Sequence, residues 1–145
     1  MQLEIIIENN GNRKSYEQGT CLQHIADDQL PDTKKNILGA FVNNKLKEMN
    51  YLIYKPKMVR FIDITDPAGK RMYVRSISFV LIKAARKLFP EARVKIEHSI
   101  SKGYYCEFEN FGRKLEVDDV SAIYKKINKI INSDLPFKRE EKLTT

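Results

Sequence analysis

The sequence predicts an α+β fold made of two small regions that meet near residue 67. Short apolar strands surround a short helix in the first half, and two long amphipathic helices flank a pair of strands in the second. Hydrophobic residues make up 42% of the chain, with seven Phe and seven Tyr, which is enough for a core. No apolar stretch approaches the roughly 20 residues that span a bilayer, and the N-terminus lacks a basic leader. We therefore expect a cytoplasmic protein without a signal peptide.

The first elements follow from an apolar run, a turn signal and helical spacing. Gln2 to Glu8 is an apolar strand, and Asn10-Gly11 is a strong hairpin turn because both residues tolerate positive φ. Arg13 to Glu17 then returns antiparallel. Residues 21–26 have helical spacing of apolar positions, and Thr20 is the expected N-cap.

Two further strands complete the first region. Ala40 to Val42 is a buried strand that runs into an Asn43-Asn44 turn, and Val59 to Ile64 is another strand. A strand pair, one helix and further strands is the order of a ubiquitin-like β-grasp, in which a sheet wraps one helix. Residues 1–66 are predicted to have this fold.

The second region, residues 67–145, is predicted to be a small α+β domain in which an antiparallel sheet packs on two long helices. Residues 66–69 form the break between the regions. The expected elements are a helix over 71–89 ended by Pro90, strands over 93–100 and 104–109, and a helix over 119–132 capped by Asp118. Residues 137–145 begin what is read as another strand.

The net charge of +7 belongs entirely to the second half. Lys/Arg and Asp/Glu number nine each from Met1 to Asp66, but seventeen and ten from Pro67 to Thr145. This asymmetry favours a polyanionic partner, such as tRNA-like RNA or the phosphates of a nucleotide. The simpler interpretation is a solvated surface with surplus lysine.

Metal and cofactor chemistry has little basis in the sequence. The two cysteines, Cys21 and Cys106, are far apart and are expected to be reduced thiols. With two histidines and no Cys cluster, no zinc site is predicted. Gly69-Lys70 lacks the earlier glycine of a phosphate-binding loop and is followed by Arg71. No cofactor and no catalytic nucleophile are predicted for this chain.

The stretch from Asp66 to Phe108 resembles the junction of two N-terminal domains of threonyl-tRNA synthetases. In that family an acidic residue and a glycine lead into a helix that opens His-Ser-x-x-His, followed by a Lys-x-Leu-[Trp/Phe]-Pro end and a Gly-[Phe/Tyr]-Tyr-Tyr-[Asp/Glu]-Phe segment. The matching residues are Asp66, Gly69, Ser76, Lys87-Leu88-Phe89-Pro90 and Gly103-Tyr104-Tyr105-Cys106-Glu107-Phe108. Gly19-Thr20, Ile25-Ala26 and residues 40–46 match the preceding TGS domain, a β-grasp.

This resemblance implies a TGS-like domain over 1–66 and a second region like the synthetase editing domain, expected to be truncated at its C-terminal end. The two histidines of the editing motif fall on Arg75 and Phe79. Hydrolysis of a mischarged tRNA ester needs imidazoles to position or activate water. Arginine is not a base near neutral pH, and phenylalanine has no lone pair. Editing activity is therefore expected to be absent.

Helical geometry places one aromatic residue among four cations. At 100° per residue a single face of the first long helix holds Arg71, Arg75, Phe79, Lys83 and Arg86. The opposite side, expected to face the core, holds Val74, Ile77, Leu81, Ala84, Ala85 and Leu88. An aromatic ring among cations can stack a base while holding phosphates. The alternative is that another element covers Phe79 and that the cations are merely solvated.

A second candidate cluster lies around the predicted strand turn. His98, Lys102 and Tyr104 could line the cleft that corresponds to the family's editing site. The alternative for His98 is a satisfied, partly buried core histidine. Tyr104 and Tyr105 point to opposite sheet faces, so one of them is expected in the core.

These observations leave three functions open. The first is a non-catalytic RNA- or nucleotide-binding or regulatory N-terminal module of a uridine kinase-like nucleoside kinase. ATP and Mg²⁺ would belong only to its missing C-terminal kinase domain, which would also be a partner. The second is a fragment of a threonyl-tRNA synthetase or a freestanding aminoacyl-tRNA editing hydrolase. The third is a structural docking or dimerisation module, and the sequence leaves the oligomeric state open.

Overall fold

A computed structural model describes residues 1–100 and 103–144 of the chain. The fold is mixed α+β and divides into two compact units, Met1–Arg75 and Ser76–Thr145. The division falls inside helix α2 (Pro67–Leu88), so this helix contributes to both units. No helix among the described residues is both long and apolar enough to cross a membrane.

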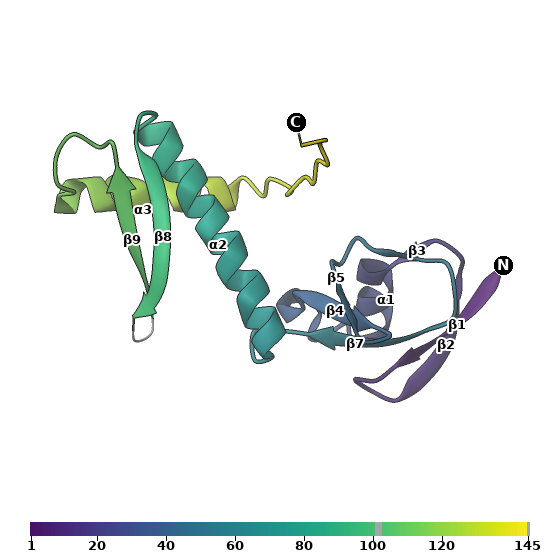
Figure 1. The fold of residues 1–145 in the computed structure, drawn as a ribbon. Helices are drawn as coiled ribbons and strands as arrows, with labels where there is room; N and C mark the ends of the chain where they lie inside the picture. The colour runs from purple at the N-terminus through teal and green to yellow at the C-terminus, as the bar shows by residue number, and fades with distance from the viewer. Residues whose placement is uncertain (101–102, 145) are drawn as a thin grey trace. The chain divides into compact units, whose positions relative to one another are not determined.

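Unit 1 is built on a five-stranded mixed sheet with the strand order β2-β1-β7-β4-β5 (Figure 1). The central pair, β1 and β7, is parallel, and the other neighbours are antiparallel. The strands are β1 (Gln2–Ile7), β2 (Asn12–Glu17), β4 (Gly39–Val42), β5 (Lys45–Lys47) and β7 (Lys57–Ile62).

Both predicted turns are present, and each joins two antiparallel strands. Gly11 has a φ of +74° between β1 and β2, where glycine carries no steric cost. Asn43 and Asn44 have φ values of 47° and 66° between β4 and β5, which is the pattern of a tight hairpin turn. Because each turn fixes the register of its strands, these residues position much of the sheet.

Helix α1 (Leu22–Gln29) supplies the other side of the unit 1 core. Alternate residues of the central strands point toward it, and the largest fully buried side chains are Ile5, Ile7, Leu22, Ile25, Ile53 and Val59. The prediction that Thr20 caps this helix is wrong: Cys21 is the N-cap, and the Thr20 hydroxyl donates to the Glu17 carbonyl at 2.6 Å. Short elements complete the unit: β3 (Thr20–Cys21), β6 (Leu52–Ile53) and the 3₁₀ helix η1 (Lys34–Asn36).

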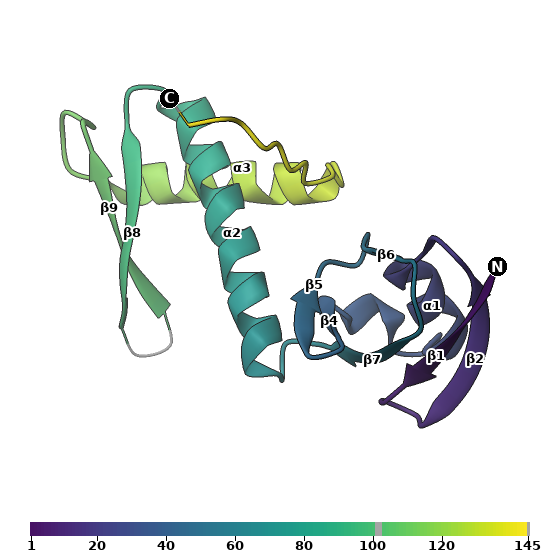
Figure 2. The ribbon, with the colours of Figure 1, turned by 45° about the vertical axis from the view of Figure 1, so that its right-hand side comes forward.

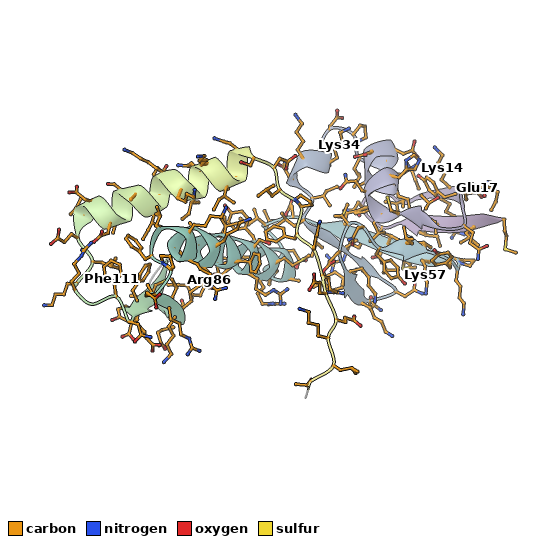
Figure 3. The ribbon with its side chains drawn as sticks, turned by 90° about the horizontal axis from the view of Figure 1, so that it is seen from above. Lys14, Glu17, Lys34, Lys57, Arg86 and Phe111 are labelled. Atoms are coloured by element: carbon orange, nitrogen blue, oxygen red, sulfur yellow. The ribbon has the colours of Figure 1, made fainter. Side chains whose placement is uncertain are left out.

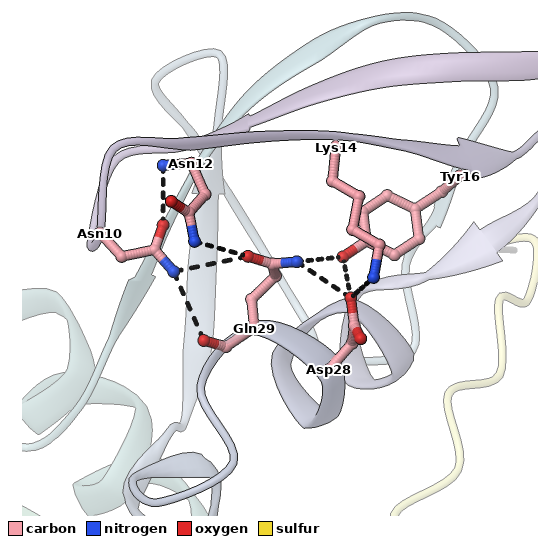
Figure 4. A network of polar contacts seen from close by, with 6 residues as sticks. All are labelled: Asn10, Asn12, Lys14, Tyr16, Asp28 and Gln29. Carbon is pink, nitrogen blue, oxygen red and sulfur yellow. Dashed lines mark hydrogen bonds and ion pairs between the residues drawn. The ribbon is translucent and has the colours of Figure 1, made fainter.

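A polar network fastens the β1–β2 hairpin to the end of α1 (Figure 4). The buried Tyr16 donates its hydroxyl to Asp28 Oδ2 at 2.5 Å, and Lys14 Nζ lies 2.8 Å from the same oxygen. Lys14 and then Tyr16 and Gln29 hold the pKa of Asp28 well below its usual range. Burial and the Asp28 carboxylate raise the pKa of Tyr16 to about 12. The tyrosine therefore remains a neutral donor and the aspartate a charged acceptor.

Helix α2 begins four residues before the predicted start because Asp66 caps it. The backbone N–H of Ala68 donates to Asp66 Oδ1 at 2.8 Å, and Pro67 occupies the first helical position, where no N–H is needed. Arg60 Nη1 also lies 3.0 Å from Asp66 Oδ2, and this contact together with the Ala68 N–H lowers the pKa of Asp66. The residues read as a break are therefore the first turn of the helix.

Unit 2 contains the β8–β9 hairpin, the second half of α2 and helix α3. Strand β8 (Arg93–Ile100) pairs antiparallel with β9 (Gly103–Glu109), and the register shifts between Ile96 and Ser99. Helix α3 (Val117–Asn132) crosses the second half of α2 in two views (Figures 1 and 2). The buried hydrophobic side chains described in this unit are Val80, Ala84, Ala85 and Ile123.

A cap and an ion pair fix the start of α3. Glu116 is the N-cap and forms a reciprocal capping box with Asp119, so the prediction that Asp118 caps this helix is wrong. The Arg113 guanidinium donates to both carboxylate oxygens of Asp119, at 2.6 and 2.8 Å. This guanidinium, with the Glu116 N–H, lowers the pKa of Asp119 to about 2. The side chain of Asp118 has neither role.

The segment after α3 is irregular. Residues 135–144 belong to no helix or strand, so the strand expected from Phe137 onward is absent from the described part of this segment.

Phe111, between β9 and α3, packs edge-on against Phe89 and Phe108, with ring centroids 4.8 and 6.0 Å away.

Candidate nucleic-acid interface

Helix α2 carries positive charge without any compensating acid. Its 22 residues contain no Asp or Glu, and its cations are Lys70, Arg71, Arg75, Lys83, Arg86 and Lys87. Arg86 and Lys87 stand in the last turn, where cations interact favourably with the helix dipole. The remaining cations have no such role, so their concentration on one helix favours an anionic ligand.

The predicted cationic face is open to solvent. Arg71, Arg75 and Arg86 are exposed, whereas Lys83 is half-buried. Arg86 is labelled on α2 in Figure 3. Within residues 1–100 and 103–144, no carboxylate lies at ion-pair distance from any of these four cations. They are therefore available to phosphates.

Phe79 lies at the centre of this face and is only partly covered. Its side chain is 57% exposed, and its ring packs against Phe137 with centroids 5.5 Å apart and planes tilted by 55°. Phe137 is itself 60% exposed. Phe79 thus packs against a second exposed aromatic ring.

The inward face of α2 is rotated from the predicted one. Val80 is buried with Ala84 and Ala85, although Val80 was not among the expected core residues. Ile77 is 39% exposed, so its predicted place in the core is wrong. The difference arises because the rest of unit 2 covers α2 along the line of Val80 and Ala84, a choice that helix periodicity alone does not determine.

The second candidate cluster is described only in part. Lys102 and the side chain of His98 lie outside the described residues. Tyr104 and Tyr105 are 50% and 43% exposed, so the expectation that one of them is in the core is wrong. The Tyr105 hydroxyl donates to Glu107 at 3.1 Å, which raises the pKa of Tyr105. Both tyrosines are outside the core because β8 and β9 form a two-stranded sheet by themselves.

The described residues offer little for metal or thiol chemistry. They contain no group of three or more His, Cys, Asp or Glu placed to hold a metal ion. Cys21 and Cys106 are free thiols, and burial raises the pKa of Cys106. A raised pKa lowers the thiolate fraction, which does not favour a nucleophilic role. A hollow lined by Glu8, Asn43, Asn44 and Met58 contains none of the predicted site residues.

One member of the aromatic pair could not be found from the helix pattern. Phe137 lies in an irregular segment far along the chain from Phe79, and only tertiary structure joins them. The available signal was weak: Leu135 and Phe137 are apolar residues on both sides of Pro136, after a helix has ended.

No protein-family model matches the chain. Its curated relatives include a threonine–tRNA ligase of Syntrophomonas wolfei, 29% identical over 132 residues, and one of Desulforamulus reducens, 30% identical over 132 residues. Each match covers 91% of this chain and 21% of the relative. A threonine–tRNA ligase of Thermotoga neapolitana is 28% identical over 143 residues, or 97% of this chain and 22% of the relative.

The chain spans about a fifth of the length of the curated relatives it matches. The matches support similarity to the N-terminal region of threonyl-tRNA synthetases. They give the nucleoside-kinase interpretation no support, so that interpretation stays a prediction. Nearly the whole length of this chain is thus similar to one segment of these ligases.

Proposed function

We propose that this chain is an N-terminal module of a threonyl-tRNA synthetase-type protein and contacts tRNA through the exposed face of α2. Unit 1 would be the TGS-type β-grasp: its strand order, with a parallel central pair and one packed helix, supports this assignment. Unit 2 would correspond to the editing-type region. The relatives' name, threonine–tRNA ligase, supplies the class of nucleic acid.

One observation carries this proposal. The cations of α2 have no acidic residue on their own helix and no described carboxylate at ion-pair distance, and they surround an exposed phenylalanine. Phosphate contacts from Lys and Arg supply most of the non-specific affinity of proteins for nucleic acids. A solvated face would be expected to contain acids that balance some of this charge.

The proposed contact is binding without hydrolysis. Arg75 and Phe79 occupy the positions of the two motif histidines, and neither side chain can act as a base near neutral pH. Incubation with seryl-tRNA and measurement of the released serine tests this point. The expected rate equals that of buffer, and deacylation that depends on protein concentration would instead favour the editing-hydrolase alternative.

The test of tRNA binding is an electrophoretic mobility shift series at rising salt. The chain is expected to bind tRNA at low salt, and the logarithm of the association constant should fall linearly with the logarithm of salt concentration. Replacing Arg75, Lys83 and Arg86 by Gln should weaken binding and reduce the slope by about one for each phosphate that is no longer neutralised.

A matched control distinguishes the effect of this site on tRNA binding from the effect of the net charge of the chain. Replacing Lys35, Lys45 and Lys55 by Gln removes the same charge from exposed positions of unit 1. This variant should bind nearly as well as the parent chain. Equal weakening by both variants, or no binding even at low salt, contradicts the proposed interface.

A further inference from the structure

Phe79 and Phe137 form an aromatic surface within unit 2. Their ring centroids lie 5.5 Å apart, yet 57% and 60% of the two side chains remain in solvent. Phenylalanine is usually buried in folded proteins. Two adjacent rings, tilted by 55° and covering each other only in part, therefore present apolar ring surface to a ligand.

The charges around this surface indicate what kind of ligand fits. Arg75 and Lys83 lie one helical turn before and after Phe79, and Lys138 follows Phe137 in the chain. Glu140 of the same segment is paired with Lys142 at 3.4 Å. A ligand with an aromatic face and nearby negative charge matches this arrangement, which is the chemistry of a nucleobase joined to phosphates.

We infer that the Phe79–Phe137 pair is a stacking platform for an unpaired nucleobase and that it makes the chain prefer single-stranded RNA to duplex RNA. The inference rests on the proposed function and adds to it the form of nucleic acid that binds. Bases in a duplex are already stacked on their neighbours, so only an unpaired base offers a free face to the rings. Phe137 lies in an irregular segment, so its ring can follow the base without unfolding a helix or strand.

Charge alone would give the opposite preference. A duplex has more phosphates per unit length than a single strand, and each phosphate contact releases more counterions, about 0.9 for B-form DNA compared with about 0.7 for single strands. If the cations of α2 acted without the rings, duplex RNA would bind at least as tightly as the single strand. The order of the two affinities thus separates stacking from electrostatic attraction.

The test uses fluorescence anisotropy with labelled oligouridine of about twelve nucleotides, alone and annealed to oligoadenosine. The parent chain is expected to bind the single strand more tightly. Replacing both Phe79 and Phe137 by Leu should weaken single-strand binding by about 5- to 150-fold, since each stacked base contributes about 1–3 kcal/mol. Affinity for the duplex should change little.

Two further variants make the result specific to the aromatic rings. Replacing both phenylalanines by Tyr keeps the rings and should keep the single-strand preference. Replacing Tyr54 and Tyr124 by Leu removes two other exposed rings and should leave it unchanged. Circular dichroism of each variant checks that the fold is retained.

Several results would overturn the inference. One is duplex binding as tight as single-strand binding, and another is a Leu pair that binds the single strand like the parent. In either case the proposed function would still stand if the Gln replacements on α2 weakened binding. Failure of the parent chain to bind any RNA at low salt would instead overturn the proposed function itself.

Discussion

Gly69, in the first turn of α2, lies against the backbone of Asp63. A Cβ atom at this position would overlap the backbone carbonyl of Asp63, and backbone cannot move aside as a flexible side chain can. The helix therefore approaches the end of β7 more closely than any other residue would allow.

Replacing Gly69 by Ala tests this close approach through the sign of its effect. Helix propensity alone predicts that alanine stabilises the fold by up to about 1 kcal/mol. The overlap predicts the reverse, a loss of about 1–3 kcal/mol in the free energy of unfolding by urea. Gly103→Ala is the control, because the nearest atom to its added Cβ, the Ile100 carbonyl oxygen, lies at 3.9 Å. A stabilised Gly69→Ala chain contradicts the steric argument.

Asp28 should make the stability of unit 1 depend on acid pH. Its pKa in the folded chain is held below the ordinary value by Lys14, Tyr16 and Gln29. A carboxylate with a lowered folded pKa stabilises the fold fully above its unfolded pKa, about 4, and loses that contribution as the pH falls below it. The parent chain should therefore exceed Asp28→Asn in urea midpoint at pH 7, and the difference should shrink from pH 5 downward.

The control is the neighbouring Asp27→Asn. Asp27 is exposed and lies 3.9 Å from Lys34, so its removal should change the urea midpoint little at any of these pH values. A gap between the parent and Asp28→Asn that stays constant down to pH 3 would mean that ionisation of Asp28 does not stabilise the fold.

At the scale of elements, the first turn of α3 offers a comparison between adjacent acids. Asp119 accepts the N–H of Glu116 and both ends of the Arg113 guanidinium, whereas Asp118 takes part in neither. Asp119→Ala should lower the thermal midpoint of unfolding clearly, and Asp118→Ala should lower it only by the small loss of a favourable dipole interaction. Equal effects would show that the charge of the turn matters and the cap does not.

The elements that the sequence predicted well are those set by local rules. The Asn10-Gly11 and Asn43-Asn44 turns were found because few residues accept positive φ. The 3.6-residue period predicted α2 and α3, the two-residue period predicted β8, and a run of apolar residues predicted β1. The short strands β3 and β6 were missed because two residues carry no period, and they form only by pairing with each other.

The candidate site, too, was predicted only where local geometry determines it. The cationic face of α2 could be projected from the sequence because helix geometry is local. The direction of the core could not, so Ile77 was placed inward, and the contact of Phe79 with Phe137 depends on packing between distant segments. The cap of α3 was misplaced because Glu116, Asp118 and Asp119 stand close together there, and only coordinates show which carboxylates reach the backbone.

At the scale of the whole molecule, the two units differ in how much apolar surface they remove from water. Unit 1 buries a continuous cluster of aliphatic side chains between its sheet and α1. In the described part of unit 2, buried hydrophobic side chains are few and mostly small, and α3 leaves Val117, Val120 and Tyr124 exposed. Hydrophobic stabilisation scales with buried apolar area, so local opening should cost less free energy in unit 2.

Hydrogen exchange of the intact chain, read by mass spectrometry at neutral pH, measures this difference. Backbone amides of β1, β7 and α1 are expected to exchange at least about tenfold more slowly than those of β9, which corresponds to about 1.4 kcal/mol in opening free energy. Ile25→Ala, which truncates a fully buried side chain of α1, should speed exchange throughout unit 1, because cavity formation in a packed core is costly. Val117→Ala, an exposed change of similar chemistry, should alter neither unit. Exchange in β9 as slow as in β1 would contradict the unequal cores, since both strands would then open only with the whole molecule.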